Sequence, residues 1–214
     1  MSDRNRVRWV WAGPAAFAWF FGWVLGLAAL RPEYHHATKA ISELGAVGAP
    51  YMLAMNAFGF VGTGVCLALF AVGYRARMGE RAVGYKSIML TALLFMMTAV
   101  PMEMGADGDP DMGSKLTRLH LVFVMLAPIP WLWALIGIAR RYVDGTPRAL
   151  ALASAAAFLG VVGVTIFLMA DRTFQAPGLV QRASFVLFLG WFAAAPYLMR
   201  NQIESRSELE KHRG

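Results

Sequence analysis

Acidic, basic and histidine side chains that could bind a ligand or move protons gather in three stretches of this sequence. They are Glu33, His35, His36 and Glu43 in the first stretch, Glu103, Asp107, Asp109, Asp111, Arg118 and His120 in the second, and Asp171, Gln181 and Arg182 in the third. Carboxylates and imidazoles can exchange protons with a substrate, and guanidinium groups can bind a phosphate. The three stretches follow the first, third and fifth apolar segments, so membrane-spanning segments would bring them to one side. The sequence therefore predicts a polar site at that side.

Glu43, Glu103 and His120 are the candidates for acid or base chemistry. A carboxyl group whose pKa is raised by partial burial could protonate a lipid or isoprenoid. The candidates for ligand binding are Ser42, Arg118, Gln181, Arg182 and Asp171, with the two arginines suited to an anionic headgroup. Both arginines are equally well explained as interfacial anchors paired with Asp171 or Glu103.

The sequence lacks a diagnostic motif for a metal or a cofactor. His35, His36 and His120 could be ligands, but no pair has the i, i+4 spacing of a helical zinc motif. Residues 107–111 resemble the opening of a calcium loop, but Arg118 stands where the closing glutamate is needed. The chain has one cysteine and no nucleophile-elbow or phosphate-binding glycine motif. We therefore predict no metal and no cofactor.

The elements that must position these residues are long apolar stretches. The chain of 214 residues is 58% hydrophobic and 15% charged, with a mean hydropathy of +0.51, which is too apolar for an ordinary soluble domain. A membrane-spanning helix needs about 20 apolar residues. Six stretches qualify, at residues 9–30, 51–73, 84–104, 117–139, 148–170 and 179–199. They predict an all-α integral membrane protein, with a six-transmembrane-helix bundle over residues 1–200 and a cytoplasmic tail over residues 201–214.

Lysine and arginine residues are distributed unevenly between the two sides of this bundle. The side of the termini has fourteen, namely Arg4, Arg6, Arg8, Arg75, Arg77, Arg81, Lys86, Arg140, Arg141, Arg148, Arg200, Arg206, Lys211 and Arg213. The other side has six, namely Arg31, Lys39, Lys115, Arg118, Arg172 and Arg182. The positive-inside rule then places both termini in the cytoplasm, in a plasma (inner) membrane. The net charge of +7 is accordingly attributed to topology and anionic lipids, not to nucleic acid.

Two local features modify the simple bundle. Residues 37–44, closed by Gly45, predict a short amphipathic or re-entrant helix between the first two spans. Pro128 and Pro130 remove backbone donors from the fourth stretch and predict a kink there.

Several short tracts carry a family resemblance. They are residues 31–34 (RPEY), 40–46 (AISELGA) and 48–50 (GAP), then Asn56 and residues 178–182 (GLVQR). Together they resemble a bacterial multi-pass membrane family catalogued as domain of unknown function 998. The resemblance implies a multi-pass fold of bacterial origin and brings no assigned chemistry.

Three functional hypotheses remain open. The first is a protein that binds or processes a lipid or isoprenoid in an extracytoplasmic pocket formed by residues 41–45, Glu103, His120 and the start of the last helix. The second is a terpene-cyclase-like membrane enzyme with a carboxylic general acid. The third is an accessory or structural subunit of a larger membrane complex or a homo-oligomer. The expected partners are membrane lipids or another hydrophobic small molecule.

Overall fold

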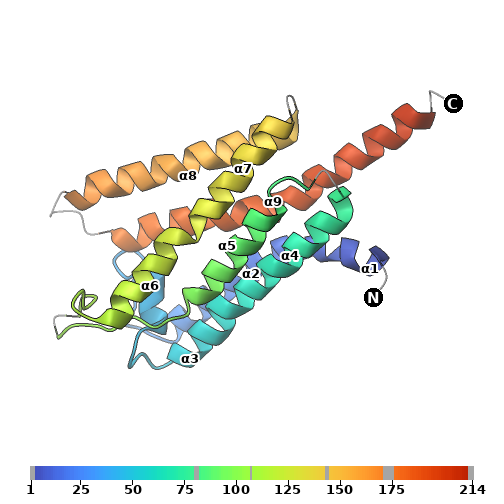
Figure 1. The fold of residues 1–214 in the computed structure, drawn as a ribbon. Coiled ribbons are helices and arrows are strands. Elements are labelled where there is room, and N and C mark those ends of the chain that lie inside the picture. Colours follow the sequence, from blue (N-terminus) through green and yellow to red (C-terminus); the bar gives the residue numbers. More distant parts are fainter. Residues whose placement is uncertain (1–2, 80–81, 107, 143–144, 171–175, 212–214) are drawn as a thin grey trace.

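The computed structural model describes residues 3–79, 82–106, 108–142, 145–170 and 176–211, and these form helices joined by short connections (Figure 1). The described part contains no β-strand, only one isolated bridge between Met104 and Pro110. The α-helices are α1 (Asp3–Arg8), α2 (Ala12–Ala29), α3 (Met52–Ala54), α4 (Thr63–Met78), α5 (Tyr85–Met97), α6 (Lys115–Leu126), α7 (Pro128–Arg141), α8 (Thr146–Ala170) and α9 (Pro177–Lys211). A π-helical segment, Met55–Gly62, joins α3 to α4, and short 3-10 helices cover Trp9–Trp11 and Ile41–Gly45.

Five helical stretches are long and apolar enough to cross a membrane. They are Arg6–Ala29, Met52–Met78, Lys115–Arg141, Thr146–Leu168 and Pro177–Tyr197. This confirms the all-helical, multi-pass prediction. The predicted third span is shorter than expected, because α5 has 13 residues and thus a length of about 20 Å. Its helix ends before Val100-Pro101, where the residue preceding a proline disfavours helical geometry.

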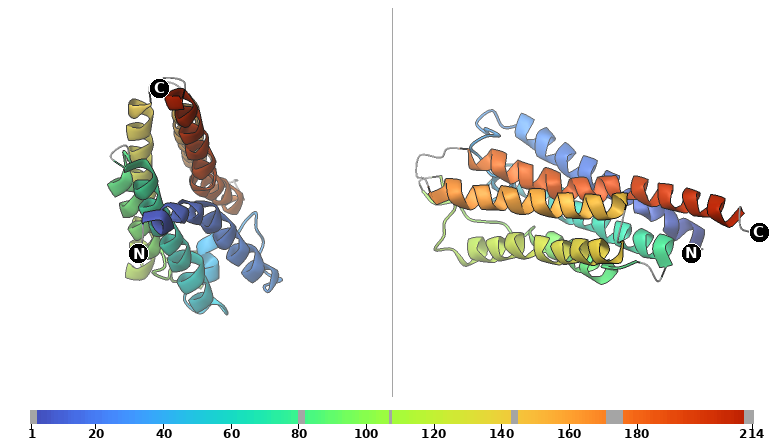
Figure 2. Two further views of the ribbon diagram at one scale, coloured as in Figure 1. Left: turned by 90° about the vertical axis from the view of Figure 1, so that its right-hand side faces the viewer. Right: turned by 90° about the horizontal axis from the view of Figure 1, so that it is seen from above.

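The termini mark one end of the bundle. Both α1 and the C-terminal part of α9 lie at that end (Figures 1 and 2). The opposite end carries the connection between α2 and α3 and the segment between α5 and α6. Helix α8 lies at the edge of the bundle and packs against α7 and α9. The chain therefore brings its first and third long connections to the same end.

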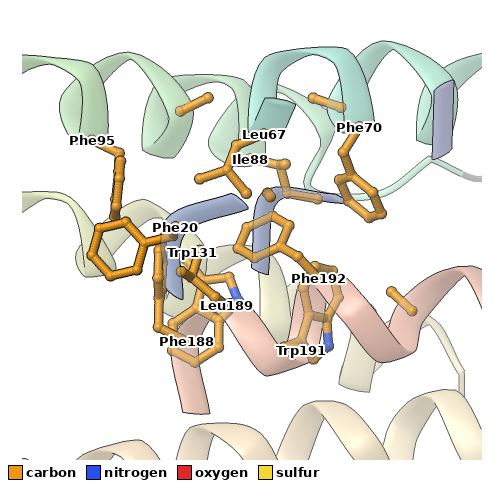
Figure 3. Close-up of a cluster of buried hydrophobic side chains, with 14 of the residues drawn as sticks. Phe20, Leu67, Phe70, Ile88, Phe95, Trp131, Phe188, Leu189, Trp191 and Phe192 are labelled. Carbon is orange, nitrogen blue, oxygen red and sulfur yellow. The ribbon is translucent and has the colours of Figure 1, made fainter. Parts of the chain in front are cut away.

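Aromatic side chains join four helices in the centre of the bundle (Figure 3). The Phe95 ring lies 5.7 Å from Phe20 of α2 and 5.9 Å from Phe188 of α9, and Trp131 of α7 lies 5.2 Å from Phe188. These rings are almost completely buried. Since lipid tails are as apolar as these side chains, close packing of the rings, not escape from water, stabilises the bundle.

Two local predictions had different outcomes. The fourth span is divided at Ala127, between the end of α6 and Pro128 at the start of α7, as expected where prolines remove backbone donors, but Ala127 itself keeps helical backbone angles, and the kink stays a prediction. The amphipathic helix predicted over residues 37–44 is wrong in extent and type, because only Ile41–Gly45 is helical, as a 3-10 helix with most of its residues buried. The N-cap residue Ala40 is extended, and its backbone N–H is bonded by a side chain instead of continuing a helix.

Candidate functional site

A cavity of about 290 Å³ opens at the end of the bundle that lies away from the termini. We call it the outer pocket. Its lining combines charged side chains with small and apolar residues, and consists of Arg31, Glu33, Tyr34, Lys39, Glu43, Ala46, Val47, Gly48, Ala49, Pro50, Met104 and Gly108. The backbone N–H of Val47 donates to the carbonyl of Met102 (2.8 Å), so the connection between α2 and α3 is bonded to the segment after α5. The pocket therefore lies between two connections that are distant in sequence.

Arg31 organises one wall of the outer pocket. Its Nε donates to Glu33 Oε1 at 2.7 Å, and its Nη1 donates to the carbonyl oxygen of Glu43 at 3.3 Å. The hydrogen bond from Arg31 holds the pKa of the Glu33 carboxyl below its usual value, so this group is ionised near neutral pH. The wall thus presents a permanent cation and a permanent anion side by side.

Glu43 is held by two partners within its own connection. Its Oε1 accepts the backbone N–H of Ala40 at 2.8 Å, and its Oε2 lies 3.2 Å from Lys39 Nζ. The Glu43 side chain is only 14% exposed, whereas that of Lys39 is 37% exposed. Glu43 therefore stabilises the start of the 3-10 helix to which it belongs, in addition to lining the pocket.

Arg182, near the start of α9, forms hydrogen bonds to the connection between α2 and α3. Its Nη1 donates to the carbonyl oxygens of His36 (2.7 Å), Lys39 (3.0 Å) and Gly178 (2.9 Å), and its Nη2 donates to the Tyr34 hydroxyl (2.6 Å). Because Nη1 carries only two N–H groups, its three carbonyl partners include a pair that shares one N–H in a bifurcated hydrogen bond. Arg182 accordingly acts as a positioning residue for the pocket wall.

The rest of the α9 start is packed onto the same connection. Gln181 Oε1 accepts the backbone N–H of Ile41 (2.6 Å), and the N–H of Leu179 donates to the carbonyl of Ala37 (3.2 Å). Gly178 faces carbonyl oxygens of the connection, and a Cβ atom there would lie 2.8 Å from the oxygen of Ala37. Only glycine allows this close backbone approach.

Tyr34 lines the pocket and is hydrogen-bonded to Arg182, which does not line it. Burial raises the pKa of its hydroxyl, so the group keeps its proton. The hydroxyl donates to the carbonyl of Ala40 at 2.9 Å while it accepts the bond from Arg182. Its ring lies 5.9 Å from the guanidinium carbon of Arg31 and 5.6 Å from that of Arg182.

Other sequence candidates lie outside this lining. His120 of α6 is buried, and its Nδ1 lies 2.8 Å from the carbonyl oxygen of Val100, in the segment that follows α5. Glu103 is joined through its backbone to Thr117, and the exposed Arg118 donates to the carbonyl of Gly113. Proton transfer by Glu43, Glu103 or His120 stays a prediction.

The remaining candidates are more dispersed. Ser42 is buried in the 3-10 helix, and Asp171 lies outside the described residues. His35 and His36 are exposed. Across the described ranges, no three His, Cys, Asp or Glu side chains are grouped so that they could hold a metal ion. The structure thus brings together Glu43, Gln181 and Arg182 from the predicted set.

Sequence reasoning missed three side chains of the outer pocket, namely Arg31, Tyr34 and Lys39. Two of them belong to the 31–34 tract, which carries part of the family resemblance. The i, i+4 spacing of Lys39 and Glu43 was a further signal, because that spacing allows an ion pair.

Comparison with known proteins identifies the family. A family described as "Protein of unknown function (DUF998)" matches residues 14–196, which include most of α2, all of α3 to α8 and most of the apolar part of α9. The chain belongs to the DUF998 family. No curated protein and no solved structure matches it. The matched region contains the whole outer pocket and the start of α9 that supports it.

Proposed function

We propose that this DUF998 protein binds a membrane lipid by its headgroup in the outer pocket. The observation that carries the proposal is the pocket's place in the fold. Arg31 comes two residues after the end of α2, and Pro50 comes two residues before the start of α3. The pocket therefore lies directly beyond the ends of two apolar helical stretches. Charged groups at the end of spanning helices lie at the level of lipid headgroups.

The composition of the pocket supports a lipid over a purely polar solute. Arg31 and Lys39 are cations suited to a phosphate group. Val47, Pro50 and Met104 add apolar surface next to them. A headgroup that carries its first acyl carbons into the pocket would satisfy both kinds of lining.

For the topology, we propose six crossings with both termini in the cytoplasm of the plasma membrane. Helix α5 runs between the α4 end and the segment that leads to α6, and residues 98–104 extend it toward the outer end. The excess of Lys and Arg at the end with the termini supports the cytoplasmic side for that end. The outer pocket then faces away from the cytoplasm.

A pocket-filling variant tests the proposed function. Ala49 lines the pocket, and Ala49→Phe would occupy space that a headgroup needs. Ala153→Phe, at an exposed position of α8, is the matched control. Native mass spectrometry of detergent-purified protein should show bound phospholipid on the wild type and on Ala153→Phe, and much less on Ala49→Phe. Equal lipid occupancy in all three proteins would contradict the proposal.

A further inference from the structure

We infer that the outer pocket selects a zwitterionic headgroup with a phosphate and a primary ammonium, which is the chemistry of phosphoethanolamine. The inference rests on the proposed function and names the ligand of the same site. It follows from the balance of charges in the lining, from the accessibility of each charged group and from the aromatic residue beside them.

The charged side chains of the pocket balance. Arg31 and Lys39 supply two positive charges, and Glu33 and Glu43 supply two negative charges. A purely anionic headgroup would gain from the cations but would lie close to both carboxylates. A zwitterionic headgroup meets charges of both signs with complementary groups.

The exposure of the charged side chains indicates which of them would bind the ammonium and which would bind the phosphate of the headgroup. Both oxygens of Glu43 are engaged by its neighbours, and the side chain is 14% exposed. The Glu33 side chain is 63% exposed, and its bond to Arg31 involves Oε1, so its carboxylate is accessible to an ammonium group. Lys39 is 37% exposed, and its ammonium has three donors, which suits a phosphate oxygen. The ammonium of the ligand is therefore assigned to Glu33 and its phosphate to Lys39.

The aromatic lining argues against a choline headgroup. Among the described residues that line the pocket, Tyr34 is the only aromatic one. Its ring already interacts with the guanidinium groups of Arg31 and Arg182. A quaternary ammonium group is recognised mainly by aromatic faces, and it cannot donate a hydrogen bond. A primary ammonium donates charge-assisted hydrogen bonds to a carboxylate, which Glu33 provides.

The test compares headgroups on the full-length protein. Native mass spectrometry in detergent would measure binding of phosphatidylethanolamine, phosphatidylcholine and phosphatidylglycerol with identical acyl chains, with soluble phosphoethanolamine as a competitor. We expect the wild type to bind phosphatidylethanolamine about tenfold more tightly than phosphatidylcholine, the effect of one charge-assisted hydrogen bond. Soluble phosphoethanolamine should compete with the lipid.

Three variants make the assignment specific. Glu33→Gln should abolish the preference for phosphatidylethanolamine over phosphatidylcholine and increase the relative binding of phosphatidylglycerol. Lys39→Gln should weaken all three lipids, because each has a phosphate. Glu204→Gln, in the distal part of α9 and outside the pocket lining, is the control and should match the wild type.

The outcomes separate this inference from the proposed function. Lipid that is displaced by Ala49→Phe but shows no headgroup preference, or a preference that Glu33→Gln leaves intact, would overturn the inference alone. The absence of any lipid that depends on the pocket would overturn both. Binding of soluble phosphoethanolamine in preference to the lipid would support the headgroup chemistry and contradict a lipid as its source.

Discussion

Gly178 offers a sharp test of how α9 holds the outer pocket. A Cβ atom at this position would lie 2.5 Å from the carbonyl oxygen of His36 and 2.8 Å from that of Ala37, and closer still to that of Lys39. All three are backbone atoms, so Gly178→Ala cannot be accommodated by the rotation of a side chain. The start of α9 must move away from the connection.

That movement weakens the bonds that cross the contact. Arg182 and Gln181 bond to carbonyl and N–H groups of the same connection. Overpacking costs about 1–3 kcal/mol, and each weakened hydrogen bond costs up to about 1 kcal/mol. We therefore expect Gly178→Ala to destabilise the protein by about 3 kcal/mol, which lowers Tm by about 6–12 °C in a domain of this size.

Gly190 provides the matched control within the same helix. No atom lies within 4 Å of a Cβ built at this position. Because alanine is the better helix former, Gly190→Ala should leave Tm unchanged or raise it slightly.

Thermal unfolding in detergent, followed by the fluorescence of the tryptophans, measures both variants under the same conditions. Headgroup binding should also be lost in Gly178→Ala and kept in Gly190→Ala. If both variants melt with the wild type, the close contact between α9 and the outer connection does not exist in the protein, and the reasoning is refuted.

Three further predictions concern the pocket and the spans. As the pH falls, the preference for phosphatidylethanolamine should persist at about pH 5 and disappear only at lower pH. The reason is that the hydrogen bond from Arg31 lowers the pKa of the Glu33 carboxyl, and a carboxyl with a lowered pKa stays ionised until the pH falls through that pKa. Binding measured at about pH 7, 5 and 3 checks this. His120→Leu should lower stability by about 1–3 kcal/mol, because the carbonyl bonded by its ring becomes unsatisfied, and an unchanged Tm would contradict this role. Trp19→Phe should destabilise more than Trp23→Phe in the same melting assay, because only the Trp19 indole N–H donates to a carbonyl of the π-helical segment, at 2.6 Å, in the described structure.

The apolar stretches could be located from the sequence because a spanning helix satisfies its own backbone hydrogen bonds. The position of such a helix therefore depends on a local run of apolar residues, and five of the six predicted stretches correspond to helices that are long and apolar enough to span a membrane. The proline effect at Pro128 is equally local. The 13-residue length of α5 was less predictable, since Ala99, Val100 and Met102 continue the apolar stretch after the helix ends.

The site was only partly predictable, because it depends on partners that are distant along the chain. The sequence indicated that polar residues gather at one end, and it singled out Glu43, Gln181 and Arg182. It did not indicate that Arg182 would bond to carbonyl groups of residues 36 and 39. Every residue has a backbone carbonyl, so the amino-acid pattern does not show which carbonyls a side chain will bind. In the sequence, an arginine that binds carbonyl groups therefore cannot be distinguished from one that is available to bind a ligand.

By itself, the sequence determined that this is a helical membrane protein and that Lys and Arg are unevenly distributed between the two ends of its bundle. Each of these properties follows from composition and from the order of residues within short stretches of the chain. The tertiary structure alone decided which charged groups share a cavity. Arg31, Glu33, Lys39 and Glu43 line the outer pocket because Arg182 and Gln181 hold their connection from a helix about 140 residues later in the chain. The geometry of such long-range contacts follows from the packing of the whole bundle.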